Sequence, residues 1–203
     1  MKVWAITGLI ASGKSEASSY FRSKGFSVCD LDDLSRRLID KSSDMGKEGF
    51  SQVYKYFGPS VLDKLGNLDR PSLRKRISQN PHEKQALEEI MNPLLHKAIT
   101  KVMTDWKTTG VKMGFLEGAR IFESGVDRLV AGVITINAPE DQRAKRIVKR
   151  DSLGKDEAKL LVQMQDGELI KKLSKFEIKN TGKLDDLKKS LDEFIEKRKA
   201  EGF

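Results

Sequence analysis

The sequence predicts an α/β fold in which a five-stranded parallel sheet carries helices on both faces. Three observations lead to this prediction. Short apolar runs alternate with helical patterns, a glycine-rich loop joins the first apolar run to the first helix, and 38% of the 203 residues are hydrophobic. The alternation is typical of parallel sheets with crossover helices. The hydrophobic fraction is enough for one sizeable core without disulfides.

The strands are expected where apolar residues follow one another over a few positions. The first covers Lys2 to Thr7, and the others cover Ser27 to Leu31, Val111 to Leu116, Val130 to Asn137 and Phe176 to Lys179. Apolar runs of this length are typical of strands that are buried on both faces. Because helical patterns separate them, consecutive strands are expected to be parallel.

A glycine-rich loop, GLIASGKS, separates the first strand from a helix expected at Glu16 to Phe21. Its two glycines, followed by Lys14 and Ser15, fit the pattern of a phosphate-binding loop. In that pattern backbone N–H groups surround phosphate oxygens, the lysine reaches the β- and γ-phosphates, and the serine binds Mg²⁺. The position between strand and helix favours nucleotide binding over a turn that binds nothing. The residues expected to contact the nucleotide here are Ile10, Ala11, Ser12, Gly13, Lys14, Ser15 and Glu16.

The composition argues against several other classes of protein. The single cysteine, Cys29, cannot form an internal disulfide and agrees with a reducing compartment. The apolar stretch at the start of the sequence is short and is interrupted by the glycine loop, which is unlike a signal peptide. No run is long enough to cross a bilayer. A cytoplasmic protein without a membrane span is therefore expected.

The chain is basic, with 38 Lys and Arg against 30 Asp and Glu and a formal net charge of +8. This charge suits a polyanionic ligand such as a nucleotide, a phosphorylated metabolite or a nucleic acid. The two signs are interspersed, so most charged side chains are expected to be solvated. His82 and His96 lack a histidine or cysteine partner at metal-binding spacing and are expected to be surface residues.

Two long segments interrupt the alternation of strands and helices. Residues 33–107 show helical patterns with breaks at Gly58-Pro59, Leu65-Gly66, Asn80-Pro81 and Asn92-Pro93, and are expected to form a helical insertion that holds an acceptor. Residues 151–172 carry many charges for their length, and a mobile lid is expected there. The core of this single domain is then expected at about residues 1–32, 108–150 and 173–203.

Seven segments, taken in sequence order, carry a family resemblance. They are Ile6 to Ser15, Val28 to Arg36, Gly66 to Arg74, Asn92-Pro93-Leu94, Phe122-Glu123, Pro139 to Asp151 and Asn180-Thr181-Gly182. Together they resemble the dephospho-coenzyme A kinase family, whose members phosphorylate the ribose 3′-hydroxyl in the last step of coenzyme A synthesis. The resemblance implies a three-layer fold of the P-loop NTPase class, ATP as phosphoryl donor, Mg²⁺ and dephospho-CoA as acceptor. It implies neither a nucleic acid nor a membrane as partner.

Acidic residues follow the second expected strand. Parallel strands in such folds point their carboxyl ends at the ligand, so Asp30, Asp32 and Asp33 are placed to meet phosphates. By the resemblance, Asp32 aligns with the catalytic aspartate, which accepts or orients the hydroxyl proton during in-line attack, and Asp30 supports it. The alternative places these residues at the N-cap and first turn of the next helix, which is the role expected for Asp33.

Glu117 ends the third expected strand. An acid after an apolar strand is the usual second motif of phosphate-loop enzymes, where it holds Mg²⁺ directly or through water, here together with Ser15. The alternative is an ionic network of Glu117 with Arg120 or Lys14.

Arg146 and Arg150 are four residues apart and share a helix face. The resemblance implies that Arg146 lies near the adenine or the lid hinge and that Arg150 is catalytic, stabilising the transferring phosphate with Lys14. The alternative pairs both arginines with Asp151 and Glu140 at the surface. By the same resemblance, the loop from Asn180 to Gly182 borders the adenine, and either Lys171 or Lys172 adds a lid charge.

The sequence departs from the family pattern mainly on the acceptor side. Asn92-Pro93 replaces His-Pro, Ala119-Arg120-Ile121 replaces Pro-Leu-Leu, and Ser78 and Ala86 occupy aromatic positions. Glu16 stands where the family has Thr. These changes indicate either a smaller or more charged acceptor or the same activity, and the same activity is favoured.

Other functions stay open. A related kinase that acts on a nucleoside or nucleotide would differ in its response to a panel of acceptors. A nucleic-acid-associated nucleotide-binding protein would show steeply salt-dependent binding to oligonucleotides, although no basic stripe or aromatic platform is evident. A regulatory protein without activity is disfavoured because Lys14, Ser15, Asp32 and Arg150 are all present. A monomer and a homo-oligomer are both compatible with the sequence.

Overall fold

The computed structural model describes residues 1–165 and 167–202. The chain forms two compact units, one made of residues 1–29 and 105–203 and the other of residues 30–104. The first contains most of the sheet, and the second is helical.

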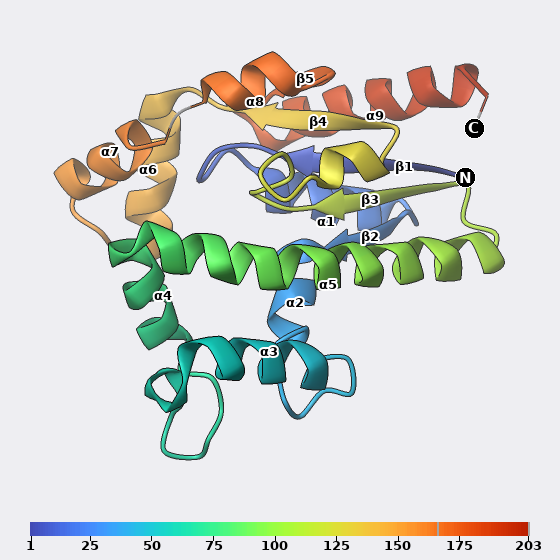
Figure 1. Ribbon diagram of the computed structural model, residues 1–203. Coiled ribbons are helices and arrows are strands. Elements are labelled where there is room, and N and C mark those ends of the chain that lie inside the picture. The colour runs from blue at the N-terminus through green and yellow to red at the C-terminus, as the bar shows by residue number, and fades with distance from the viewer. Residues whose placement is uncertain (166, 203) are drawn as a thin grey trace. The chain divides into compact units, whose positions relative to one another are not determined.

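The predicted α/β fold with a five-stranded parallel sheet is confirmed (Figure 1). The strands are β1 (Lys2–Thr7), β2 (Ser27–Asp30), β3 (Met113–Glu117), β4 (Gly132–Asn137) and β5 (Phe176–Lys179). Their order across the sheet is β2-β3-β1-β4-β5. β1 pairs in parallel with both β3 and β4, and β4 pairs in parallel with β5. The strand that precedes the glycine loop is therefore central.

Two strands begin later than the apolar pattern predicted. Val111 and Val130 are apolar but belong to the turns that precede β3 and β4. The N–H of Val111 donates to the carbonyl of Trp106 at 2.9 Å, and Val130 ends a short 3₁₀ turn. Apolar composition alone does not separate such turn residues from the strand that follows them.

Helices surround the sheet in the first unit. They are α1 (Lys14–Ser23), the 3₁₀ helix η2 (Val126–Leu129), α6 (Glu140–Asp151), α7 (Lys155–Gln163), α8 (Glu168–Leu173) and α9 (Leu184–Ala200). α1 and α9 contact each other and the sheet, and their apolar faces join the core. In that core the rings of Phe21 and Phe115 stack with centroids 3.9 Å apart. Each large apolar side chain that is fully buried contributes about 1.5–3 kcal/mol, so this core holds β1 and the start of α1 in place.

The second unit contains α2 (Leu31–Arg37), α3 (Lys47–Phe57), the 3₁₀ helix η1 (Pro59–Val61), α4 (Arg70–Gln79) and most of α5 (Pro81–Thr108). Its core consists of Val53, Phe57, Val61 and Leu73, with partly buried aliphatic side chains from α4 and α5 packed around them. The predicted breaks at Gly58-Pro59 and Asn80-Pro81 are helix ends.

The predicted break at Asn92-Pro93 is wrong, because α5 continues through Pro93. A proline inside a helix costs about 3 kcal/mol through the lost N–H donor and a backbone clash. The next two turns offset this cost by burying apolar side chains at about 1.5–3 kcal/mol for each large one. The buried residues are Leu94, Leu95, Ala98 and Ile99.

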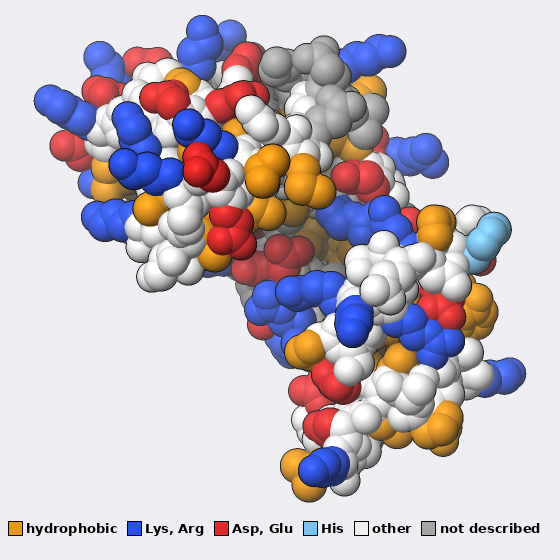
Figure 2. Space-filling model, turned by 90° about the vertical axis from the view of Figure 1, so that its left-hand side faces the viewer, with side chains coloured by type: hydrophobic (Ala, Val, Ile, Leu, Met, Phe, Trp, Pro, Cys, Tyr) orange, Lys and Arg blue, Asp and Glu red, His pale blue; other side chains and the backbone are white. Residues whose placement is uncertain are grey.

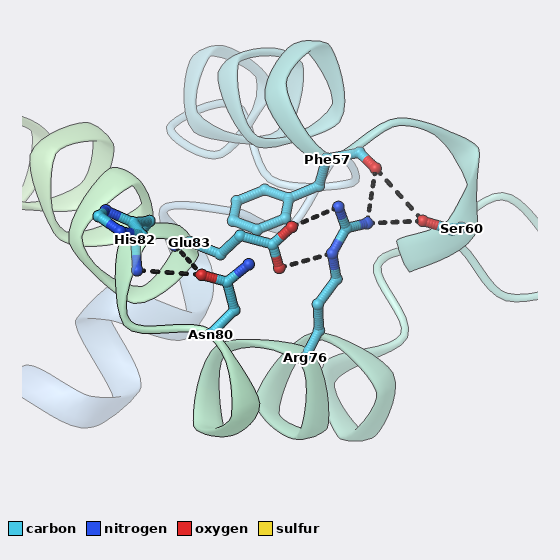
Figure 3. Close-up of polar contacts among 6 residues, drawn as sticks. All are labelled: Phe57, Ser60, Arg76, Asn80, His82 and Glu83. Carbon is cyan, nitrogen blue, oxygen red and sulfur yellow. Dashed lines mark hydrogen bonds and ion pairs between the residues drawn. The ribbon is translucent and has the colours of Figure 1, made fainter.

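Arg76 of α4 links three elements of the helical unit (Figure 3). Its Nε and Nη2 donate to the two carboxylate oxygens of Glu83 in α5, both at 2.6 Å. Its Nη1 donates to the carbonyl of Phe57 at 3.1 Å and to Ser60 Oγ at 2.9 Å. Asn80 accepts the N–H of Glu83 at 3.3 Å and caps α5. The corner between α4 and α5 is thus held to the end of α3 by a charged group.

None of the helices within the described part of the chain is long and apolar enough to cross a membrane.

Candidate phosphate-binding site

The glycine loop connects β1 to α1 and has three residues with positive φ: Gly8 at 153°, Ala11 at 56° and Gly13 at 107°. Gly13 has no room for a side chain, because a Cβ there would lie 2.2 Å from Nδ2 of Asn180. A Cβ on Gly8 would lie 2.4 Å from the carbonyl oxygen of Ile136 in β4. Both glycines are therefore required by close approaches.

Arg146 and Asn180 hold the loop from outside. Arg146 Nη1 donates to the carbonyls of Ala11 at 3.1 Å and Ser12 at 3.2 Å. Its Nη2 donates to Asn180 Oδ1 at 3.1 Å, and Asn180 Nδ2 donates to the Ser12 carbonyl at 2.8 Å. These bonds fix the shape of the loop, although two of its N–H groups are themselves engaged: that of Ile10 donates to Gln165 at 2.7 Å and that of Ser12 to the carbonyl of Leu9 at 3.2 Å. Anion binding at such a loop uses N–H groups that face the ligand.

Lys14 begins α1 and folds back over the loop. Its Nζ donates to the carbonyls of Gly8 at 2.9 Å and Leu9 at 3.2 Å. The ammonium group is thereby held beside the loop, within the reach that the phosphate-loop pattern requires.

Ser15 and Glu117 lie together. The hydroxyl of Ser15 donates to Glu117 Oε1 at 3.2 Å, and Glu117 is 7% exposed at the end of β3. A hydroxyl and a carboxylate supply the hard oxygen ligands that Mg²⁺ prefers. The two residues singled out for the metal from the sequence are therefore adjacent. The described residues contain no group of three or more His, Cys, Asp and Glu that could hold a metal by itself.

A cavity of about 440 Å³ opens beside the loop. Four basic side chains and one acidic one line it, and its full lining is Ala11, Gly13, Lys14, Ser15, Glu16, Arg146, Lys149 and Arg150. Its charge and size suit the phosphates of a nucleotide.

Arg150 is turned to a neighbour in the structure. Its Nε and Nη2 each donate to a carboxylate oxygen of Asp151 at 2.7 Å. This bidentate hydrogen bonding raises the pKa of Arg150 and lowers the pKa of Asp151, and the charge of Glu16 raises that of Arg150 further. The surface pair that was the alternative role of Arg150 is thus present, at the edge of the cavity.

The aspartates after β2 start α2. Asp30 caps this helix, and its Oδ1 accepts the N–H of Asp32 at 2.8 Å and of Asp33 at 3.0 Å. Asp33 lies in the first turn, so the capping role belongs to Asp30. Asp32 is exposed, and its carboxylate accepts none of the cap hydrogen bonds.

The remaining predicted residues are placed as follows. Gly182 is exposed in the loop after β5, and Ala119 and Arg120 are exposed after β3. Asn92 is half-buried within α5. Lys172 is exposed, and the side chain of Lys171 lies outside the described residues.

Two residues at the site were not predicted from the sequence. Lys149 lines the cavity, and its spacing of three from Arg146 could have shown it. Gln165, after α7, accepts the N–H of Ile10 at 2.7 Å. Nothing in the sequence distinguishes Gln165 from a solvated glutamine.

Basic and acidic side chains are interspersed over the face of the molecule drawn in Figure 2. On the face shown in Figure 2, the described Lys and Arg side chains lie among Asp and Glu side chains and form no continuous basic stripe. A nucleic-acid-binding surface would concentrate them.

Comparisons with known proteins agree with this geometry. A family model described as dephospho-CoA kinase matches residues 2–186. A curated protein of Fusobacterium nucleatum named dephospho-CoA kinase is 30% identical over 196 residues, which cover 94% of this chain and 95% of the relative.

Two solved structures are similar over almost the whole chain. One is TT1252 from Thermus thermophilus, with a TM-score of 0.80, 27% identity and 97% of each chain covered. The other is titled as a dephospho-CoA kinase from Campylobacter jejuni, with a TM-score of 0.71, 27% identity, and 99% of this chain and 98% of that chain covered.

Proposed function

The chain belongs to the dephospho-CoA kinase family, and we therefore propose that it transfers the γ-phosphoryl group of ATP to the ribose 3′-hydroxyl of dephospho-CoA. The observation that carries this proposal is the basic cavity beside a phosphate-binding loop whose carbonyls are fixed by Arg146 and Asn180. Transfer is direct and in line, without a covalent enzyme intermediate.

The donor phosphates bind where the loop N–H groups and the start of α1 face the cavity. Lys14 moves its ammonium from the loop carbonyls to the β- and γ-phosphates. Arg146 keeps the loop in shape and borders the adenine together with Asn180 and Gly182. Binding at a helix N-terminus adds the favourable field of the helix dipole.

The hydroxyl of Ser15 and the carboxylate of Glu117 would hold Mg²⁺. Both are oxygen ligands, they are 3.2 Å apart, and Glu117 is buried, which limits competition from water. When bound, the ion would neutralise charge on the β- and γ-phosphates.

Asp32 is the proposed base. Asp30 rather than Asp32 accepts the capping hydrogen bonds of α2, so the Asp32 carboxylate is not committed to that cap. Asp32 then accepts or orients the proton of the attacking 3′-hydroxyl. Arg150 leaves its ion pair with Asp151 and binds the phosphate that is being transferred, and its guanidinium stabilises the charge that develops there.

The lid is proposed for residues 151–172, which contain α7. Its closure would exclude water and limit hydrolysis of ATP. Backbone hydrogen exchange in this segment should slow when ATP and acceptor analogues bind together, and an unchanged rate would contradict the closure.

The function is tested by ADP release with ATP and Mg²⁺. Dephospho-CoA, adenosine, nucleoside monophosphates and a sample without acceptor are compared for the wild type and Asp32→Asn. We expect turnover with dephospho-CoA alone and its loss by about 100-fold or more in the variant. Turnover on another acceptor would show that Asn92, Ala119 and Arg120 mark a changed acceptor pocket. Nucleotide binding without any turnover would contradict the proposal.

A further inference from the structure

Arg143 is a buried cation that is only weakly paired with an acid among the described residues. Its side chain is 3% exposed, and its ion pair within the described residues is long, 3.8 Å from Nη2 to Oε1 of the largely exposed Glu140. Nε and Nη1 find no hydrogen-bond partner among the residues that the structure describes. Burial lowers the pKa of Arg143 because it disfavours the charged guanidinium. Since a weakly paired buried charge is costly, this group calls for a further anionic partner.

The other buried arginine among the described residues, Arg198, is better matched, although its Nε also lacks a hydrogen-bond partner there. Arg198 forms an ion pair with Glu201 at 2.6 Å. Its guanidinium also lies over the rings of Trp4, Phe176 and Phe194, at 5.6, 4.6 and 5.6 Å from their centroids. Arg143 has no ring contact of this kind in the described part of the chain.

Arg143 lines a cavity of about 760 Å³ at the carboxyl ends of β4 and β5. This volume is in the range that holds small ligands, about 300–1,000 Å³. Lys179, the last residue of β5, is a second cation in its wall, and Glu140 is the one acid among the described lining residues. Thr181 and the amide of Gln165 add neutral donors. The wall therefore favours an anion with several oxygen acceptors.

This cavity is separate from the phosphate-loop cavity. The two share no lining residue, although both border α6, where Arg143 precedes Arg146 by three residues. Gln165 lines the larger cavity and also accepts the N–H of Ile10 in the loop. A ligand in the larger cavity thus reaches a side chain that contacts the phosphate loop.

We infer that this cavity is a second anion site, which takes the phosphate group of a small molecule between Arg143 and Lys179. A phosphate monoester carries about −1.5 to −2 charges near neutral pH, which matches two cations better than a single carboxylate does. A guanidinium can meet two phosphate oxygens with parallel N–H donors, and to do so the buried side chain of Arg143 must turn toward the cavity.

The test separates this site from the ATP site by using Lys14→Ala as the background. Inorganic phosphate in metal-free buffer is titrated by calorimetry into Lys14→Ala, Lys14→Ala with Arg143→Met, and Lys14→Ala with Lys145→Met. Lys145 is the matched control, because it is an exposed cation on the same helix that does not line this cavity. We expect one bound phosphate with Lys14→Ala, about tenfold or more weaker binding with Arg143→Met, and unchanged affinity with Lys145→Met.

Stability gives a second readout. Replacing the weakly paired buried charge of Arg143 by an apolar side chain of similar length should leave the Tm without phosphate unchanged or higher. Phosphate should raise the Tm of Lys14→Ala, and Arg143→Met should abolish that rise. Should Arg143→Met fail to fold, Arg143→Gln takes its place.

Three results would overturn the inference. They are a Lys14→Ala protein that binds no phosphate, an Arg143 variant that binds it as tightly as the Lys145 control, and citrate binding as tightly as phosphate. Failure of the proposed kinase activity is a different result, because the titrations use neither ATP nor acceptor.

Discussion

Replacing the small side chain of Asn180 should weaken both the stability of the protein and the phosphate-binding loop. Asn180 is 5% exposed and follows β5. Asn180→Ala removes the hydrogen bond from Nδ2 to the Ser12 carbonyl (2.8 Å) and the one that Oδ1 accepts from Arg146 (3.1 Å). The neutral bond is worth about 1 kcal/mol and the charged one about 1.5–3 kcal/mol. The variant should therefore lose about 2.5–4 kcal/mol of stability.

The loss of stability can be measured as a lower Tm, and the effect on the loop can be measured as a higher KM for ATP. For a chain of this length, 1 kcal/mol corresponds to about 2–4 °C, so Asn180→Ala should melt about 5–15 °C lower. The KM for ATP should rise about tenfold, because the loop carbonyls lose part of their anchor. Gln85→Ala is the control, since it also removes a side-chain amide, is exposed, and bonds to Glu89 on its own helix.

A double-mutant cycle tests the reasoning behind the magnitude. Arg146 and Asn180 share the Ser12 carbonyl as acceptor and bond to each other. Arg146→Met and Asn180→Ala should therefore be less than additive by about 0.5–3 kcal/mol. The reasoning is refuted if Asn180→Ala matches Gln85→Ala in both Tm and KM, or if the effects of Arg146→Met and Asn180→Ala are additive.

Three further predictions concern other contacts. Hydrogen bonds from Arg76 lower the pKa of Glu83 in the folded protein. The pair therefore stabilises the protein at pH values above the carboxyl's unfolded pKa of about 4.3. This stabilisation is lost as the pH falls through the lower pKa of the folded state. Below about pH 4.5 the Tm of the wild type should therefore fall more steeply with pH than that of Glu83→Gln, and equal slopes would contradict this. Gly13→Ala should abolish ATP binding in calorimetry because its Cβ would lie 2.2 Å from Asn180 Nδ2, whereas Gly154→Ala, where nothing lies within 4 Å, should bind normally. Glu117→Gln should raise the Mg²⁺ concentration for half-maximal activity by about tenfold or more, with the exposed Glu123→Gln as control; the same Mg²⁺ dependence in both would argue against a metal role for Glu117.

The sheet could be predicted because its strands are short, apolar and separated by helices. β1 and β5 have the predicted bounds. The errors in the strand bounds occur where an apolar residue lies in a turn instead of a strand, as at Val111 and Val130. Pro93 was expected to end a helix, but burial of the apolar side chains in the turns after it outweighs the tendency of proline to break a helix.

The residues of the candidate site could be named from the sequence, but the hydrogen bonds between them could not. The loop pattern identified Lys14 and Ser15, and the strand position identified Glu117, which lies beside Ser15. Arg146 donates hydrogen bonds to the loop carbonyls because of where α6 packs, and no local sequence pattern predicts that packing. The contact of Gln165 with Ile10 spans 155 positions and follows only from the folded chain. Arg143 looked like one more solvated cation and is buried.

The distance along the chain between Ser12 and Asn180 also bears on synthesis. The donor that fixes the Ser12 carbonyl is 168 positions downstream of it, so a growing chain carries the glycine loop long before its last anchor has been made. Translation at about 5–20 residues per second puts this interval at roughly 10–30 seconds. During that time the loop lacks both β5 and the Asn180 amide. An incomplete chain therefore lacks this hydrogen bond to the Ser12 carbonyl until β5 and Asn180 have been made.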